Sequence, residues 1–477
     1  MIDVCVIGAG VSGLAAATFV EEAGMTVQVW EAAAQPGGNV RSDSDEGRVL
    51  DRAANGWLDN EPAMGRLLDL LGLTPRLVSP TDQFGTRWIL ADGRMQAAPL
   101  GMGKLLRSDL ISTGAKLRAI LEPLMPRGAS ARADEPHADE SVGDFVRRRL
   151  GPAFVDRMIG PMVAGIYATD PDELSLRGAF QRLFELEREH RSLVVGMARG
   201  SRTGAPRGKL NTLPGGAGEL SSTMAQRLGG RLTCDRRVTH LQPTPDGWEV
   251  KAQSASGTEH SLLARHVILA CPAPAQARIV APVDNEASEA LHGIPYGPVV
   301  VVCTAWSKGS WSIDPEGFGV LLARNEAQRI GGIDGVLGML FTSSIFPDHT
   351  HSDEVLIRTI LGGSIAPEIF EASDQELIAR ARRAAAICLG PERKPPNMIR
   401  VYRHPAGIPQ YRVGHPARVA TVRAAETRHP GLYFIGNHLE GIGVKDCARA
   451  GLEVATKITA RHPSDPLSPP MPVERSP

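Results

Sequence analysis

The feature that most constrains this chain lies at its start, in the stretch VCVIGAGVSGLAAATFVEEAGMTVQVWEA, residues Val4 to Ala32. An apolar run, three spaced glycines, a small-residue segment and a second apolar run ending in an acid are typical of a βαβ unit. Gly8 permits the tight turn, Gly10 lets the backbone approach a pyrophosphate, and Gly13 lets the helix pack on the strand. The chain therefore starts with a unit that predicts dinucleotide binding.

The ends of this unit support the same interpretation. Unpaired N–H groups at the helix start, aided by the helix dipole, hold phosphate charge. Gly24 is expected to end the helix. Glu31 ends the second strand, where its carboxylate accepts hydrogen bonds from ribose hydroxyls and would repel the 2′-phosphate of NADP. The alternative, a structural turn, explains the glycines but not the strand, helix and acid in register.

Two further segments favour FAD over NAD. A second loop with a glycine doublet and the cation Arg41, QPGGNVRS (Gln35 to Ser42), is placed to touch the same pyrophosphate from its far side. Far along the chain, Gly431 to Ala455 predicts a strand that ends at Gly436, a glycine-rich turn and a helix that begins near Asp446. Such a helix start stabilises negative charge on a flavin ring as the ring accepts a hydride. The alternative for this segment is an ordinary strand–turn–helix.

Bulk properties exclude several classes of protein. A chain of 477 residues predicts two or three domains. A net charge of −1 argues against a nucleic-acid partner. Six scattered cysteines without a CxxC pair argue against disulfides and zinc and favour a reducing compartment, and no metal-ligand spacing is present. Without a signal sequence or an apolar run long enough to span a membrane, we expect a cytoplasmic protein.

Hydrophobic periodicity predicts helices and strands between polar linker segments, which are here called seams. The seams are 126–141 and 198–210, expected to be loops, and 462–477, too rich in proline to fold. Predicted strands of one sheet are 2–7, 26–30, 238–241, 248–252, 266–271 and 432–435, and those of another sheet are 299–306 and 354–363. Predicted helices are 11–23, 142–150 with Ser141 as N-cap, 375–388 and 448–460.

These motifs together resemble the protoporphyrinogen oxidase branch of the flavin amine oxidase and phytoene desaturase superfamily. The likeness runs from about residue 2 to about residue 460. The segments that carry it, besides the two cofactor segments, are GGNVRS, VAGIYATDPDELS (163–175), FELEREHRSLVVG (184–196), GFGVLLARNEAQ (317–328), SSIFPD (343–348) and GIPQYRVGH (407–415).

The resemblance implies an α/β chain (α+β overall) with a Rossmann-like FAD-binding domain, a mixed-sheet substrate domain and a helical, membrane-facing subdomain. The discontinuous FAD-binding domain would comprise 1–84, 208–290 and 402–462. Residues 85–98 and 291–401 would form the substrate domain, 99–207 the helical subdomain and 463–477 a disordered tail.

The resemblance also implies site residues by position. Those expected to bind FAD are Gly8, Ala9, Gly10, Val11, Ser12, Gly13, Glu31, Ala32, Gly38, Asn39, Arg41, Ala53, Ala54, Asn55, Gly56, Val238, Ala270, Gly436, Ile442, Gly443 and Val444. Those expected to bind substrate are Arg87, which would pair with a propionate, and Gly165, Leu321, Phe346 and His404. No catalytic side chain is assigned, because the flavin carries the chemistry.

Two positions depart from the family pattern: Ala53 replaces a glycine before the flavin-edge residues, and His404 replaces a tryptophan before the Ile-Pro-Gln-Tyr segment. Plainer roles also fit some side chains. Arg87 fits a surface arginine stacked on an aromatic ring, and Phe346 fits core packing. Lys445 and Asp446 fit helix-start roles better than proton transfer.

The activity implied is oxidation of protoporphyrinogen IX to protoporphyrin IX, with hydride transfer from a meso carbon to flavin N5 and O2 as acceptor. The alternatives are oxidation of coproporphyrinogen III, an amine oxidase or desaturase of a specialised pathway, and a non-catalytic partner that delivers porphyrin to a chelatase. Homodimerisation and product hand-off to a chelatase stay open. Leucines at helical spacing among basic residues in 99–126 favour peripheral contact with a membrane face, and a plain surface helix fits them too.

Overall fold

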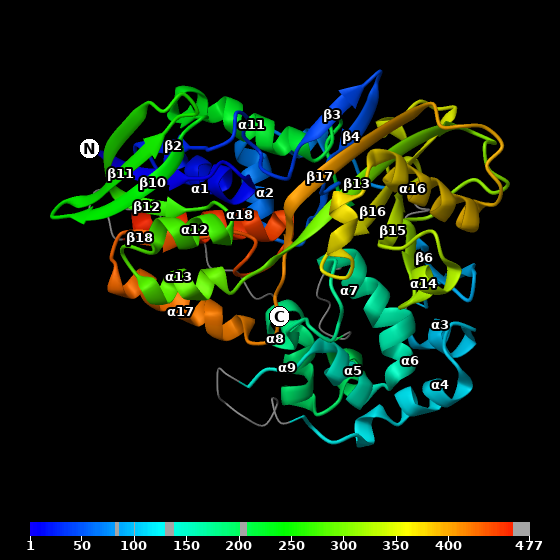
Figure 1. The fold of residues 1–477 in the computed structure, drawn as a ribbon. Helices are drawn as coiled ribbons and strands as arrows, with labels where there is room; N and C mark the ends of the chain where they lie inside the picture. Colours follow the sequence, from blue (N-terminus) through cyan, green and yellow to red (C-terminus); the bar gives the residue numbers. More distant parts are fainter. Residues whose placement is uncertain (82–84, 100, 129–137, 201–207, 461–477) are drawn as a thin grey trace.

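The computed structural model describes residues 1–81, 85–99, 101–128, 138–200 and 208–460, which form two sheets and a group of helices (Figure 1). The predicted loops 126–141 and 198–210 lie partly outside these residues. The loop prediction is wrong at 198–200, because these residues form the end of a helix that runs over Leu193–Gly200. The predicted tail lies wholly outside them, so its prediction of disorder is untested.

The first sheet is built on the opening βαβ unit. Strand β1 (Ile2–Ile7) pairs in parallel with β2 (Val27–Trp30) on one side and with β12 (Glu259–Leu269) on the other. The strand order is β10-β11-β12-β1-β2-β9, with β18 beside β12. The remaining strands are β9 (Leu232–Thr233), β10 (Arg237–Thr244), β11 (Gly247–Gln253) and β18 (Leu432–Phe434). Since Val4–Ile7 of β1 and Val267–Leu269 of β12 are apolar and buried, both faces of the sheet centre are covered.

Helices cover the two faces of this sheet. On one face lie α1 (Val11–Glu22), α2 (Pro62–Leu70), α11 (Gly218–Leu228) and α18 (Val444–Thr459). On the other face lie α12 (Ala273–Val280), α13 (Asn285–His292) and α17 (His415–Arg428). Helix α1 has almost no polar side, because α18 covers it. The two helices lie so close together that a Cβ at Gly451 of α18 would lie 2.7 Å from the Ala16 nitrogen of α1. A glycine is therefore required for this close approach.

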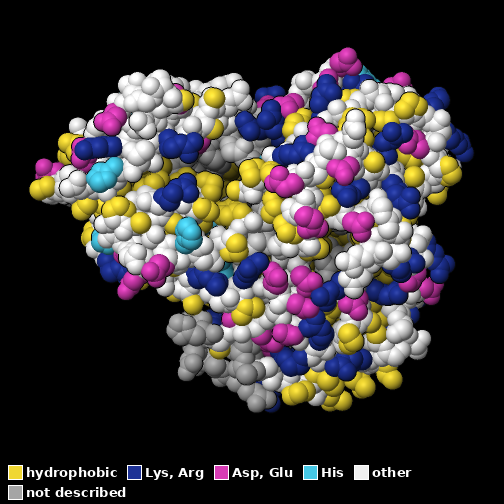
Figure 2. All heavy atoms as spheres, viewed as in Figure 1, with side chains coloured by type: hydrophobic (Ala, Val, Ile, Leu, Met, Phe, Trp, Pro, Cys, Tyr) yellow, Lys and Arg dark blue, Asp and Glu magenta, His cyan; other side chains and the backbone are white. Residues whose placement is uncertain are grey.

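The second sheet has the strand order β17-β13-β16-β15-β14-β6-β7. Its strands are β6 (Arg87–Ala91), β7 (Arg94–Ala97), β13 (Tyr296–Ser307), β14 (Gly319–Leu322), β15 (Val336–Phe341), β16 (Glu354–Gly362) and β17 (Met398–Pro409). Helix α16 (Asp374–Leu389) covers one face. The two sheets lie side by side, and the surface between their lobes is hollowed (Figure 2).

A group of helices forms the third part of the molecule, at the bottom of Figure 1. The helices are α3 (Met102–Arg107), α4 (Thr113–Ile120), α5 (Val142–Arg149), α6 (Pro152–Phe154), α7 (Gly160–Tyr167), α8 (Leu176–Ala179), α9 (Gln181–His190) and α10 (Leu193–Gly200), and a π-helical turn at Val155–Ile159 joins α6 to α7. They share one apolar core that includes Phe145, Phe154 and Tyr411.

The predicted elements are confirmed in type, with shifts at their ends. Ser141 caps α5, accepting a hydrogen bond from the Asp144 nitrogen at 3.0 Å, and Gly24 follows α1 with φ +79°. Helix α18 begins at Val444, two residues before the predicted start, because Asp446 caps it by accepting from the Gly443 nitrogen at 3.1 Å. None of the six cysteines forms a disulfide.

Two boundaries differ from expectation. The basic, leucine-containing segment 99–126 forms two short helices, α3 and α4, broken at Ser108–Ser112. Strand β17 stays hydrogen-bonded to β13 as far as Pro409, although residues from 402 onward were assigned to the FAD-binding domain. The strand therefore carries the second sheet further along the chain than expected, and the division into domains stays a prediction.

A buried ion pair links the two parts of the chain. Arg48 lies on β4 (Arg48–Asp51), which pairs with β3 (Ser42–Asp45), and its Nε and Nη2 both donate to Glu354 at 2.7 Å. The Arg48 guanidinium lowers the pKa of Glu354 to about 2. This bidentate pair joins the N-terminal segment to the first residue of β16.

We expect E354Q to lower the melting temperature by several degrees. The lowered pKa of Glu354 corresponds to a contribution of roughly 3 kcal/mol to the free energy of unfolding. This contribution is fully present above the ordinary pKa of 4.5 and is lost as the pH falls toward about 2. The difference in melting temperature between wild type and E354Q should therefore shrink from pH 5 to pH 3. The control is E453Q, which removes the exposed Arg449 pair and should change little. An unchanged difference across that pH range would contradict the prediction.

Candidate functional site

Three loops meet at the carboxyl ends of the parallel strands. Gly8, directly after β1, has φ +108°, and a Cβ there would lie 2.8 Å from the Cys271 nitrogen in the loop after β12. A Cβ at Gly13 would lie 2.0 Å from the Gly8 oxygen, whereas a Cβ at Gly10 would meet nothing within 4 Å. The first loop is therefore packed tightly at Gly8 and Gly13 and open at Gly10, as a pyrophosphate site requires.

Glu31 holds the shape of this loop. Its Oε2 accepts from the Ala9 nitrogen at 2.7 Å, and its Oε1 accepts from the Ala33 nitrogen at 2.8 Å. Each carboxylate oxygen has a second lone pair, so the predicted contact with ribose stays available. Ala32 is exposed beside it. The carboxylate therefore has a structural role that the sequence did not reveal.

The predicted second loop lies against the first. The Gly37 nitrogen donates to the Ala9 oxygen at 2.7 Å, and a Cβ at Gly38 would lie 3.3 Å from the Gly10 Cα. Arg41 follows, and its buried Nε has no hydrogen-bond partner within the described part of the chain. Asn39, by contrast, donates to the Ala406 oxygen at 3.1 Å and the Gly407 oxygen at 3.2 Å of β17. The Asn39 amide thus ties the loop to the second sheet, and its contact with FAD stays a prediction.

The start of α18 reaches the same place. Cys447, in its first turn, hydrogen-bonds Ser12 in the first turn of α1, and burial raises the pKa of this thiol to about 11. Val11 and Val444 share one apolar cluster. Gly443 is the N-cap of α18, and Ile442 packs on the core of the helical part. The two helix N-termini are therefore neighbours, although 433 residues separate their first residues along the chain.

The remaining predicted FAD residues line this region. A Cβ at Gly13 would also meet the Ala270 Cβ at 3.0 Å. Gly436 follows β18, the neighbour of β12. Val238 is buried at the start of β10. It lies close to Glu31, because the backbone nitrogen of Arg236 donates to the backbone carbonyl of Glu31 at 2.8 Å. Loops, glycines and helix ends thus fit a dinucleotide that runs from β10 to α18.

The segment after β4 connects this region to the second sheet. The Arg52 carbonyl accepts from His404 Nε2 at 2.9 Å, and the Ala53 carbonyl accepts from Arg358 Nη2. Burial and nearby guanidiniums lower the pKa of His404, so it is a neutral donor. Asn55 has a buried Nδ2 without a protein partner, and a Cβ at Gly56 would lie 2.4 Å from the Asn211 oxygen. Ala54 lies between these fixed points and packs on the apolar core around α1.

Four predicted substrate residues gather around β14. Arg87 is exposed on β6 opposite Gly319 of β14, and its guanidinium lies over Phe318, 5.4 Å from the ring centroid. Leu321, also on β14, fills the space beside Gly165, where a Cβ would lie 2.5 Å from Leu321 Cδ2.

Phe346 is fully buried in a cluster with Leu210 and Ile345, against which Phe318 packs. His404 lies on β17, at the opposite edge of the sheet from β14 and its partner β6. Substrate contact by Phe346 and His404 stays a prediction, since both side chains already have protein contacts.

Other residues at the site were not foreseen. Buried Gln276 donates from Nε2 to the carbonyls of Leu269, Cys271 and Ile435, which locks the ends of β12 and β18 together. Arg358 is buried and hydrogen-bonds the flavin-edge segment. A signal for Arg358 was present, because it is a charge inside the apolar run VLIRTILGG. Gln276 gave no such signal, since a polar residue near a helix start is ordinary.

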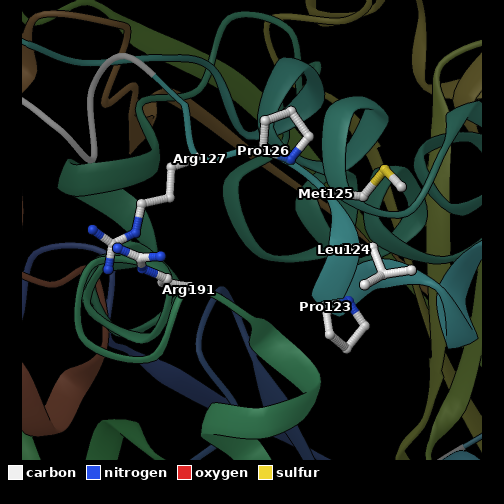
Figure 3. Close-up of a pocket in the computed structure, with 6 residues that line it drawn as sticks. All are labelled: Pro123, Leu124, Met125, Pro126, Arg127 and Arg191. Carbon is white, nitrogen blue, oxygen red and sulfur yellow. The ribbon is translucent and has the colours of Figure 1, made fainter.

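One cavity, of about 510 Å³, lies in the helical part and is lined by Pro123, Leu124, Met125, Pro126, Arg127 and Arg191. Figure 3 shows the Arg127 and Arg191 guanidiniums side by side, on the other side of the cavity from Pro123, Leu124 and Met125. Across the described ranges, every helix is too short or too polar to cross a bilayer, and no three potential metal ligands are grouped.

Comparison with known proteins agrees with this geometry. Residues 11–459 match the family described as flavin containing amine oxidoreductase. Protoporphyrinogen oxidase 2 of Arabidopsis thaliana is 30% identical over 478 residues, covering 95% of this chain and 93% of the relative. Coproporphyrinogen III oxidase of Bacillus subtilis is 27% identical over 471 residues, covering 94% and 96%.

A solved structure supports the fold alone. A candidate protoporphyrinogen oxidase from Exiguobacterium sp. 255-15 superimposes with a TM-score of 0.80 at 20% identity, covering 96% of this chain and 99% of that one.

We expect G13A to lose most of its bound flavin. The added methyl would lie 2.0 Å from the Gly8 oxygen, so α1 must move away from the phosphate loop. Flavin absorbance per protein should fall by about tenfold or more. The matched control is G65A in α2, where a Cβ meets nothing within 4 Å and alanine favours the helix. A G13A protein that keeps full flavin content would refute the placement of the cofactor.

Proposed function

The chain belongs to the family of flavin-containing amine oxidoreductases and is an FAD-dependent oxidoreductase, and from this premise we propose that it oxidises protoporphyrinogen IX to protoporphyrin IX with O2 as acceptor. The observation that carries the proposal is the full-length similarity to protoporphyrinogen oxidases at 30% identity. In this proposal the N-termini of α1 and α18 would hold the cofactor, and the separate mixed sheet would face the substrate.

The side chains around β14 suit a flexible apolar macrocycle that carries acidic groups. Arg87 offers an exposed guanidinium, which pairs well with a carboxylate such as a propionate. Leu321 and Gly165 offer a smooth apolar surface, because the glycine has no side chain that would project from it. FAD, when bound, supplies the two-electron oxidant. The chain itself needs to hold the substrate, orient it and exclude water.

The second candidate is oxidation of coproporphyrinogen III, favoured by the full-length similarity to two coproporphyrinogen III oxidases. That substrate carries four propionates rather than two. The family's amine-oxidising members leave a third candidate, an amine substrate. The substrates differ in charge, so direct comparison separates them.

The test is anaerobic mixing of the holoprotein with each porphyrinogen and with simple amines, followed by flavin absorbance. We expect protoporphyrinogen IX to bleach the flavin fastest, and O2 to restore the colour with release of H2O2. Faster bleaching by coproporphyrinogen III, or by an amine, would replace the proposal with that alternative. We expect R87A to weaken protoporphyrinogen binding by about 1.5–3 kcal/mol, seen as a rise in KM. The control is R94A, on the neighbouring strand β7.

We further propose that this is a cytoplasmic protein that contacts a membrane face peripherally. Leu117, Ile120, Leu121 and Leu124 in and after α4 are 42–76% exposed. Figure 2 shows hydrophobic side chains gathered at the lower edge of the molecule. Arg127 and Arg191 line the same cavity as Leu124, and cations near exposed apolar side chains suit an anionic interface.

Flotation with phosphatidylcholine vesicles, with and without an anionic phospholipid, tests the membrane contact. We expect the triple variant L117S/L121S/L124S to lose at least tenfold in vesicle binding, because each serine removes exposed apolar surface. The matched control is L263S/I313S, which removes exposed apolar side chains elsewhere on the molecule. Equal binding by the triple variant and the control would contradict this surface.

A further inference from the structure

Three arginines are buried in the part of the chain that the structure describes. Arg48, Arg149 and Arg358 are 6%, 0% and 1% exposed. Arg48 pairs with Glu354, and Arg149 pairs with Glu122. Arg358 forms no ion pair with any described carboxylate, all of which lie beyond 4.0 Å of its nitrogens. An unpaired buried cation is costly, so its retention calls for a specific role.

The contacts of Arg358 point to the flavin-edge segment. Its Nη2 donates to the Ala53 carbonyl, and its positive charge acts on Cys303 of β13, where it opposes the rise in the thiol pKa that burial causes. Its Nε and Nη1 are buried and have no hydrogen-bond partner among the residues that the structure describes. The side chain thus spans from β16 to the turn that begins at Ala53, with two N–H groups left over.

The carboxylates near Arg358 do not neutralise its charge by forming an ion pair with it. Asp51 is fully buried, and its Oδ1 accepts from the Ser42 hydroxyl at 2.6 Å and the Ala217 nitrogen at 2.9 Å. Its Oδ2 has no hydrogen-bond partner among the described residues, and no Arg358 nitrogen lies within 4.0 Å of either oxygen. Arg52 pairs with Asp43 at 2.7 Å. Asp51 and Arg358 both act on the pKa of Cys303, so they share one buried region without touching.

Two adjacent carbonyls are held by two strands of the second sheet. His404 on β17 holds Arg52, and Arg358 on β16 holds Ala53. Both strands pair with β13 and lie beside it in Figure 1. His404 is neutral, because burial lowers its pKa. Of the two side chains that hydrogen-bond this segment, His404 and Arg358, only Arg358 therefore carries a full positive charge.

We propose that Arg358 is a positioning residue of the flavin site, which fixes the Ala53–Asn55 turn and favours the reduced, negatively charged flavin through its unpaired charge. A fixed cation in a water-poor environment stabilises nearby negative charge more strongly than in water. We rest this proposal on FAD binding and on the assignment of Ala54 and Asn55 to the flavin edge, and not on the porphyrinogen substrate.

The test is the equilibrium between oxidised and reduced flavin in the purified holoprotein, measured anaerobically against a reference redox dye. For R358M we expect at least a tenfold shift toward oxidised flavin, which equals about 30 mV for a two-electron couple. R358K keeps the charge and should stay within about threefold of wild type. R358Q keeps a donor for the Ala53 carbonyl without the charge, so it should shift as R358M does.

The matched control is R149M, which removes a buried arginine from the helical part of the molecule. It should lower the melting temperature and leave the flavin equilibrium unchanged. A wild-type equilibrium in flavin-bound R358M or R358Q would overturn the proposal. An equal shift in R358K, or loss of FAD from all three Arg358 variants, would show a purely structural role and would overturn it too.

Discussion

Close backbone approach at a few glycines is the constraint on which the rest of the structure depends. Gly13 lets α1 lie on the Gly8 carbonyl, and Gly451 lets α18 lie on Ala15 and Ala16 of α1. Because these contacts leave no room for a side chain, the two helices start side by side. Their unpaired N–H groups then face one region at the carboxyl ends of the parallel strands. The cofactor site follows from this packing.

The second sheet is joined to that site by polar contacts in addition to the apolar packing of Leu50 and Leu210. Asn39 reaches β17, Arg48 reaches Glu354, and His404 and Arg358 hold the carbonyls of Arg52 and Ala53. Each of these bonds has a defined direction, whereas apolar packing alone would let the parts slide. The polar contacts therefore fix the orientation of the second sheet relative to the predicted cofactor loops.

The local pattern was enough to find most elements and the cofactor loops. Strands β1, β2, β13 and β16 are apolar runs of the right length, and Ser141 and Gly24 mark helix ends by their own backbone chemistry. The break between α3 and α4 was missed, because leucines and basic residues at helical spacing continue across Ser108–Ser112. The extent of β17 was missed because only its pairing with β13 defines it.

The sequence by itself determined the opening βαβ unit, the second glycine loop and the distant strand–turn–helix, because each depends on neighbours within a few residues. Only the tertiary structure decided that Glu31 braces the Ala9 and Ala33 nitrogens, that Ser12 meets Cys447, and that Arg358 reaches Ala53. These contacts join residues that are far apart in the chain, or depend on which rotamer packing allows. No periodicity encodes them, so the fold had to bring the groups together before their roles could be seen.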